Sequence, residues 1–281
     1  MPIVVDRISK SFPEPGNRRK RKLVLQDVSF SVPNGCFVSL LGPSGCGKTT
    51  TLTIIAGFQT KDSGEIFVDG KAVEKPGPDR AFVFQDYALL PWLRVGENIE
   101  YPMLKQGLGK EERKERLKQL LQLAQLEDNE KSYIYELSGG MKQRVALLRA
   151  LACAPKILLM DEPLGAVDFQ MRKLLQLQLE SILMQRDVTT LMVTHDVDEA
   201  VYLSDRVIVM GRDHGNILAD VTIDLPRPRD RMDPRYRAYS DQLTELLKQA
   251  LNGGVFTKED EEIMNFIKNA EHEAKGGAAR G

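Results

Sequence analysis

A glycine-rich segment between a short apolar stretch and a helical pattern constrains the fold more than any other feature of this sequence. The apolar stretch covers residues 36–41, and the helical pattern begins near Lys48 and ends by Gly57. In this context a G-x-x-x-x-G-K-[ST] loop points backbone N–H groups at phosphate oxygens, and the helix amino terminus adds partial positive charge. The sequence therefore predicts a phosphate-binding loop, rather than a turn without a ligand, formed by Gly42, Pro43, Ser44, Gly45, Cys46, Gly47, Lys48, Thr49 and Thr50.

A second apolar stretch, at residues 157–160, ends in two carboxylates. Because ligands of α/β proteins bind where strands end, Asp161 is predicted to hold Mg²⁺ through a water molecule, and Thr49 of the phosphate loop is predicted to offer its hydroxyl to the same ion. Successive strand residues point in opposite directions, so Glu162 is predicted to face the attacking water as a general base. Alone, an Asp-Glu pair after a strand is more often a helix cap, but the phosphate loop upstream favours a metal and water site.

Apolar strands alternate with helical stretches along most of the chain, which is typical of an α/β fold with a parallel sheet. Strands are predicted at residues 3–5, 28–32, 36–41, 80–85, 157–160, 189–193 and 206–210, with a hairpin at 65–73 around Asp69-Gly70. A charged helical pattern at residues 98–131 indicates a helical insertion that covers about residues 88–155. This insertion interrupts a main domain of residues 1–228. Residues 229–281 are predicted to form an extension with helices near 239–251 and 257–274 and a disordered tail.

Composition narrows the classes of partner. The formal net charge is -1, so the chain lacks the basic field of a nucleic-acid-binding protein, and we expect no nucleic-acid partner. No apolar run is long enough for a membrane span, and the first residues lack the apolar stretch of a secretion signal. Three widely spaced cysteines, Cys36, Cys46 and Cys153, suit a reducing compartment. These features predict a cytosolic protein unless a partner holds it at a membrane.

Five consecutive basic residues, at 18–22, stand in a Pro/Gly-rich segment that is predicted to be a loop. The simplest interpretation is a solvated hairpin tip, while contact with anionic lipid headgroups or with nucleotide phosphates remains open.

The segment that decides between families of phosphate-loop enzymes precedes the strand at 157–160. Its residues, Leu137, Ser138, Gly139, Gly140 and Met141, resemble the LSGGQ signature of the ABC (ATP-binding cassette) ATPases. In that family the signature touches the γ-phosphate held by a partner subunit. The resemblance thus implies a dimer of two ATPase subunits, either identical or close paralogues. Met141 stands where the family most often has Gln, but the serine and both glycines are intact.

Four further residues occupy positions of ABC motifs in the expected order. The resemblance makes Gln85 a Q-loop residue that reaches Mg²⁺ and the attacking water, and Asp168 the D-loop aspartate. It makes His195 the switch histidine, which contacts the γ-phosphate and organises Glu162 and the water. Phe12 fits the aromatic residue that stacks on adenine, although a Phe beside a strand is equally consistent with core packing. The implied fold is an ABC-type P-loop NTPase, with a mixed core sheet, an antiparallel β subdomain and an inserted helical subdomain.

Residues 76–99 and 225–230 resemble the nitrate, sulfonate, taurine and bicarbonate importer ATPases. This resemblance implies ATP and Mg²⁺ as cofactors, two transmembrane permease subunits, an extracytoplasmic solute-binding protein, and a peripheral position on the cytoplasmic face of the inner membrane. The cargo would be a small anionic solute, and the permease would dock near Tyr87, Leu90 and Trp92. The alternatives are a soluble ABC protein of translation or DNA repair, a non-catalytic regulatory cassette, and a P-loop kinase or GTPase.

Overall fold

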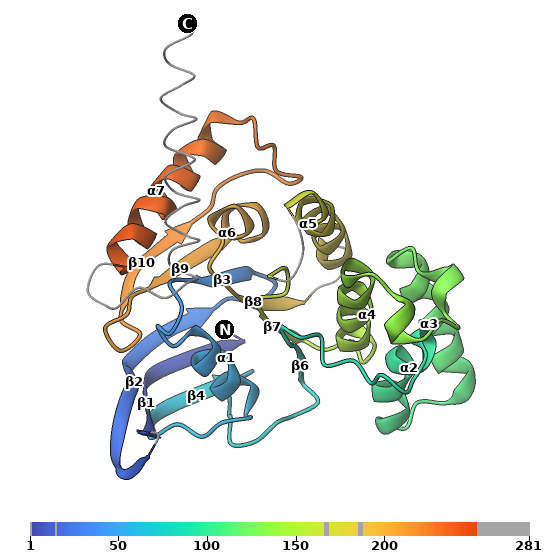
Figure 1. The fold of residues 1–281 in the computed structure, drawn as a ribbon, viewed down its shortest axis with the longest axis horizontal. Coiled ribbons are helices and arrows are strands. Elements are labelled where there is room, and N and C mark those ends of the chain that lie inside the picture. Colours follow the sequence, from blue (N-terminus) through green and yellow to red (C-terminus); the bar gives the residue numbers. More distant parts are fainter. Residues whose placement is uncertain (1, 15, 166–168, 185–187, 252–281) are drawn as a thin grey trace, which may run out of the picture.

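The computed structural model describes residues 2–14, 16–165, 169–184 and 188–251, which form two sheets surrounded by helices (Figure 1). The larger sheet has the strand order β10-β9-β3-β8-β7-β6 within these described residues. Its strands are β3 (Phe37–Leu41), β6 (Arg80–Val83), β7 (Ile157–Asp161), β8 (Thr189–Thr194), β9 (Arg206–Met210) and β10 (Ile217–Thr222). All neighbouring pairs are parallel except β10 with β9, which are antiparallel. The predicted mixed core sheet is therefore confirmed.

The smaller sheet is antiparallel, with the order β2-β1-β4-β5. It consists of β1 (Ile3–Glu14), β2 (Asn17–Val32), β4 (Ser63–Val68) and β5 (Lys71–Ala72). The predicted hairpin turn lies between β4 and β5, where Asp69 and Gly70 both have positive φ values of 49° and 75°. Two consecutive residues with positive φ match the right-handed twist of a tight hairpin, which explains the Asp-Gly pair.

The basic run is part of a strand, and its prediction as a loop was wrong. β1 and β2 stay paired almost to the tip of their hairpin, with Phe12 opposite Lys22 and Glu14 opposite Asn17. Pro13 is tolerated in β1 because β4 pairs with β1 only as far as Ser9, so the backbone of Pro13 faces no strand on that side. The basic residues thus extend a two-stranded ribbon away from the sheet (Figure 1).

Helix α1 (Lys48–Ala56) packs in the space between the two sheets (Figure 1). Its Leu52 and Ile55 are fully buried, in one apolar cluster with Ile66 of β4 and Leu159 of β7. The helix ends at Gly57, as predicted, with φ 81°. A side chain there would also meet the backbone of Lys75, because an added Cβ would lie 2.4 Å from its carbonyl carbon.

The opposite face of the larger sheet packs against helices α4 (Gly139–Leu151), α5 (Phe169–Met184), α6 (Val197–Leu203) and α7 (Pro234–Leu251). Buried residues of β7 alternate between the two faces, since Leu158 and Met160 belong to this second cluster while Leu159 belongs to the first. A strand buried on both faces reads as a continuous apolar run, which is the pattern seen at residues 157–160.

The chain between β6 and β7 forms the helical insertion, on the right in Figure 1. It contains α2 (Val95–Lys105), α3 (Lys110–Leu123), the short 3₁₀ turns η1 (Glu127–Asn129) and η2 (Ile134–Glu136), and α4. The predicted helical stretch at 98–131 is broken after α2, where Gly107 takes a positive φ of 81°. The boundaries 88–155 and 1–228 stay predictions.

The carboxy-terminal part differs in extent from its prediction. α7 begins at Pro234, before the predicted start near residue 239, and β10 was not predicted. The predicted helix at 257–274 and the predicted disordered tail lie outside the described residues. Within the residues that the structure describes, no helix combines the length and apolar character of a membrane span.

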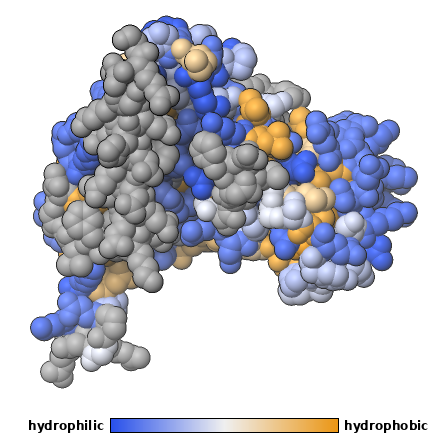
Figure 2. Space-filling view, turned by 45° about the horizontal axis from the view of Figure 1, so that its top comes forward, coloured by the Kyte–Doolittle hydropathy of each residue, from blue (hydrophilic) through white to orange (hydrophobic). Residues whose placement is uncertain are grey.

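Among the described residues seen in Figure 2, hydrophilic side chains predominate, and hydrophobic ones gather beside the helical lobe on the right. In and beside the insertion, large apolar side chains are exposed at Trp92, Leu104 and Tyr135.

Candidate nucleotide site

The phosphate loop connects β3 to α1 and is shaped by close backbone approaches. A Cβ on Gly42 would lie 2.4 Å from the carbonyl oxygen of Met210, so only glycine fits there. Gly47 has φ 104°, a conformation that glycine adopts readily, and caps α1 without a side-chain hydrogen bond. The first N–H groups of α1 are therefore left without a side-chain partner, which suits an anion at the helix amino terminus.

Lys48 is buried beneath the loop. Its Nζ donates hydrogen bonds to the carbonyl oxygens of Gly42 and Pro43, at 2.7 and 2.9 Å. These carbonyls hold the ammonium group inside the curve of the loop, where it can compensate the charge of a bound phosphate.

Thr49 and Asp161 bring two hard oxygen ligands together. The Thr49 hydroxyl donates a 2.9 Å hydrogen bond to Oδ1 of Asp161, across the gap between α1 and the end of β7. Burial raises the pKa of Asp161, and the bond from Thr49 opposes this shift. A hydroxyl and a carboxylate at this spacing suit Mg²⁺, which prefers oxygen ligands and keeps several waters.

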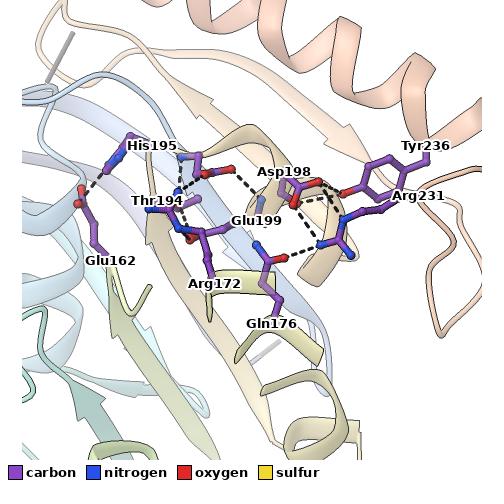
Figure 3. Close-up of polar contacts among 10 residues, drawn as sticks. Glu162, Arg172, Gln176, Thr194, His195, Asp198, Glu199, Arg231 and Tyr236 are labelled. Atoms are coloured by element: carbon purple, nitrogen blue, oxygen red, sulfur yellow. Dashed lines mark hydrogen bonds and ion pairs between the residues drawn. The ribbon is translucent and has the colours of Figure 1, made fainter. Parts of the chain in front are cut away.

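Glu162 and His195 form a pair at the ends of β7 and β8 (Figure 3). Oε2 of Glu162 lies 3.2 Å from Nδ1 of His195. Contact with Glu162 raises the pKa of His195 despite its burial. Burial alone would raise the pKa of Glu162, but His195 and the charge of Lys48 together outweigh burial and lower it. The pair thus favours an ionised carboxylate beside a protonated or readily protonated imidazole.

The direction of Glu162 does not come from strand alternation, so that part of the sequence argument was wrong. β7 ends at Asp161, and Glu162 has a left-handed backbone with φ 43°. Its N–H donates to the carbonyl of Val193 at 3.0 Å, and its own carbonyl accepts from Gly165 at 3.1 Å. A non-glycine residue in this region costs about 1–3 kcal/mol and is held by its surroundings.

Lys48, Thr49 and Glu162 open onto one cavity of about 450 Å³, which also reaches the smaller sheet, while Asp161 and His195 lie behind them and do not line it. Its lining residues are Phe12, Lys22, Val24, Ser44, Gly45, Gly47, Lys48, Thr49, Thr50, Gln85 and Glu162. Phe12 is half-buried and lies in this wall, with Nζ of Lys10 5.3 Å from its ring centroid. The structure therefore brings the phosphate loop, the predicted adenine-stacking residue and Gln85 together.

Lys22 and Val24 were not singled out from the sequence. Lys22 is opposite Phe12 in the antiparallel register, and directly opposed residues project from the same face of a sheet. The sequence signal for Lys22 is the basic run itself. Once the register of the hairpin is known, one residue of this run must project from the same face of the sheet as Phe12.

The signature residues form a separate feature at the amino terminus of α4. Ser138 caps the helix by accepting a 3.3 Å hydrogen bond from the N–H of Met141, and Gly139 and Gly140 lie in the first turn. None of the cavity-lining residues named above belongs to α4. The predicted D-loop residue Asp168 lies outside the described residues.

Three features define the class of ATP-binding cassettes. They are a phosphate loop between two sheets, an Asp-Glu pair at the end of a strand, and a glycine-containing helix amino terminus, capped by a serine, on a helical insertion. The family model described as ABC transporter matches residues 25–165, and this chain belongs to the ABC transporter family. Its fold is similar to two dimeric structures of the ATP-binding cassette MJ0796, one of them in a post-hydrolysis state with ADP and Pi. They are 29% and 30% identical, with TM-scores of 0.68 and 0.69, and each match covers 79% of this chain and 98% of that chain. The chain is thus an ATPase of the ABC type.

Similar sequences extend over most of the chain. An uncharacterized ABC transporter ATP-binding protein of Methanocaldococcus jannaschii is 45% identical over 88% of this chain and 91% of its own length. The aliphatic sulfonates import ATP-binding protein SsuB of Bacillus cereus is 39% identical over 91% of this chain and 98% of its own length. The bicarbonate transport ATP-binding protein CmpC of Synechococcus elongatus is 42% identical over 88% of this chain, and the match spans only 38% of that longer protein.

Proposed function

We propose that this chain hydrolyses ATP to power uptake of a small anionic solute through a membrane permease. The observation that carries the proposal is the convergence of Lys48, Thr49, Asp161, Glu162 and His195 around the end of the phosphate loop. The likeness to sulfonate and bicarbonate transport proteins supports the solute class. A peripheral position on the cytoplasmic face of the inner membrane follows from that role.

In the proposed reaction the chain positions phosphate, metal and water. The loop N–H groups and Lys48 bind the phosphates of ATP, while Thr49, Gln85 and, through water, Asp161 hold Mg²⁺. Bound there, Mg²⁺ would neutralise charge on the phosphate oxygens. Glu162 accepts a proton from the attacking water, and His195 orients Glu162 and contacts the γ-phosphate.

We infer that the active unit is a pair of cassettes. The amino terminus of α4, with Ser138, Gly139 and Gly140, offers N–H groups to a phosphate but does not line the cavity of its own chain. In a dimer it would close the site of the second cassette. The partner is either a second copy or a close paralogue.

The segment that follows Gln85 is proposed to dock the permease. Arg149 of α4 donates to the carbonyl oxygens of Tyr87 and Ala88, at 2.9 and 2.7 Å, which ties this segment to the helix carrying the signature. The Trp92 side chain is 70% exposed, so it is free to insert into a partner surface. The permease would itself receive the solute from an extracytoplasmic binding protein.

The catalytic proposal is tested by Glu162→Gln, which keeps the shape of the side chain but removes the base. ATP hydrolysis should fall by about 10²- to 10⁴-fold while ATP binding persists, and an ATP-bound dimer should accumulate in size-exclusion chromatography. Glu115→Gln, on the exposed face of α3, is the matched control and should leave turnover unchanged. Near-normal turnover of the Glu162 variant would assign the base elsewhere.

The transport proposal is tested with the complex of cassette, permease and binding protein in liposomes. Hydrolysis should rise when the binding protein is supplied with nitrate, bicarbonate, a sulfonate or another small anion. Stimulation by a sugar or an amine, with no response to these anions, would contradict the proposed solute class. The assignment of the chain as an ATPase would stand.

A further inference from the structure

The loop that carries His195 is held on both sides by buried polar contacts. Thr194, the last residue of β8, donates through Oγ1 to Oε2 of Glu199 at 2.7 Å. The same hydroxyl accepts the N–H of Asp196 at 3.0 Å. His195 thus stands between two residues joined through one hydroxyl group, and that hydroxyl is anchored to a buried carboxyl group on α6.

Arg172 of α5 fixes the other end of this loop (Figure 3). Its Nη1 donates a 2.7 Å hydrogen bond to Oδ2 of Asp196, and its Nε lies 3.9 Å from Oε1 of Glu199. Asp196 uses its other carboxylate oxygen to cap α6, by accepting from the N–H of Glu199 at 3.1 Å. One guanidinium group therefore hydrogen-bonds one of the two carboxyl groups that flank the turn from β8 into α6 and lies within ion-pair distance of the other.

Burial of these side chains makes it costly to break the contacts between them. Glu199 is 2% exposed, and Arg172 and Asp196 are largely buried in their side chains. Charge-assisted hydrogen bonds in such surroundings are short and hold their geometry, whereas exposed ion pairs exchange with water. A shift of the loop would strand a buried carboxyl group, which is costly.

From this geometry we propose that Arg172 is a positioning residue for catalysis, because it holds the His195 ring against Glu162. The inference rests on the catalytic roles proposed above for His195 and Glu162. Arg172 is not among the residues that line the cavity; it acts through Asp196 and Glu199 on the turn that aims the imidazole. α5 begins one residue after the predicted D-loop residue Asp168, so a displacement of α5 would reach His195 through the same contact.

A second cluster on α6 provides a control for a purely structural role. Asp198 accepts a 2.6 Å hydrogen bond from Oη of Tyr236 and pairs with Arg231 at 3.1 Å. Figure 3 shows this cluster on the side of α6 away from Glu162. Tyr236→Phe removes a buried polar contact of the same helix without touching the turn that carries His195.

The experiment compares Arg172→Met, Arg172→Lys and Tyr236→Phe in the full chain. We expect Arg172→Met to lower kcat of ATP hydrolysis by about 10- to 100-fold with little change in KM, because a small misplacement of a catalytic group has that effect. Lysine should restore part of kcat, since its ammonium can still reach Asp196. Tyr236→Phe should leave kcat unchanged and lower only the melting temperature.

Nuclear magnetic resonance of the imidazole groups supplies a direct readout of position. The chain has three histidines, so the resonance of His195 can be assigned by substituting His214 and His272 in turn. Contact with Glu162 raises the pKa of His195, and Arg172→Met should shift its titration to lower pH as that contact loosens. Tyr236→Phe should leave the titration in place.

Thr194→Val tests the same idea if Arg172→Met fails to fold, because valine is nearly isosteric and suits a strand. Thr194→Ser keeps the hydroxyl and should behave as wild type. Unchanged kcat and unchanged His195 titration in both Arg172→Met and Thr194→Val would overturn the positioning role. A shifted titration with unchanged kcat would instead overturn the catalytic role proposed for His195, while the positioning of its ring would stand.

Discussion

Replacing Glu199 by glutamine should change how stability depends on pH. Burial, with a further contribution from the charge of Asp196, raises the pKa of Glu199 from 4.5 to about 8, while Thr194 and Arg172 oppose the shift. The folded protein therefore binds a proton here over a pH range in which the unfolded chain has lost it. Glutamine keeps the shape and the acceptor for Thr194 but has no proton to lose.

Proton linkage gives the sign and the size of this change in the free energy of unfolding. Because the folded pKa is raised, the stabilising contribution of Glu199 is fully present below pH 4.5 and is lost as pH rises through about 8. Within that window the free energy of unfolding of the wild type should fall, relative to the variant, by about 1.4 kcal/mol for each pH unit. Taking the difference between the two proteins removes the contribution of distant titrating groups to the pH dependence.

Urea unfolding followed by circular dichroism at pH values from 5 to 9 measures this difference. The stability of the variant relative to the wild type should rise from pH 5 to about pH 8 and level off above it. A difference that stays constant across the range would show that Glu199 titrates normally, and the argument from burial would then be refuted.

Substitutions at three positions test other parts of the structure. Phe12→Ala should weaken ATP binding by about 1–3 kcal/mol while Phe12→Tyr preserves it, and lost stability with unchanged affinity would make Phe12 a packing residue. Gly57→Ala should lower the free energy of unfolding by more than about 1 kcal/mol, since alanine would adopt positive φ against the backbone of Lys75; an unaltered urea midpoint would contradict this. Glu162→Gly should be more stable than Glu162→Ala, because only alanine is strained at φ 43°, and the reverse order in urea would disprove strain.

The fold and the phosphate loop could be predicted because their signals are local. Apolar stretches at 36–41 and 157–160 match β3 and β7, and the hairpin at Asp69-Gly70 and the end of α1 at Gly57 are confirmed. Each depends on backbone preferences or on burial within a few residues. The family comparison confirms the ABC ATPase fold.

Features that depend on distant contacts were missed or mistaken. The Pro/Gly-rich segment before Lys22 was taken for a loop, because local composition hides the pairing of β2 with β1. β10 was not predicted, since its alternately exposed residues show no continuous apolar run. Arg172 and Glu199 come from different helices and meet only after α5 and α6 pack together, so no spacing in the sequence indicates their contact.

The distinction between local signals and distant contacts also explains how the side chains of the candidate site are oriented. The motifs supply the chemical groups, but the aim of Glu162 comes from a left-handed residue held by Val193 and Gly165, and not from the period of its strand. The turn that carries His195 is held by the hydroxyl of its neighbour Thr194, which contacts α6, and by a guanidinium group on α5. Pre-organisation of this kind keeps the reacting groups in place before ATP arrives, and its cost is spread over the tertiary contacts that hold the turn. A cassette that kept every motif but lost Arg172 would therefore be expected to bind ATP well and hydrolyse it slowly.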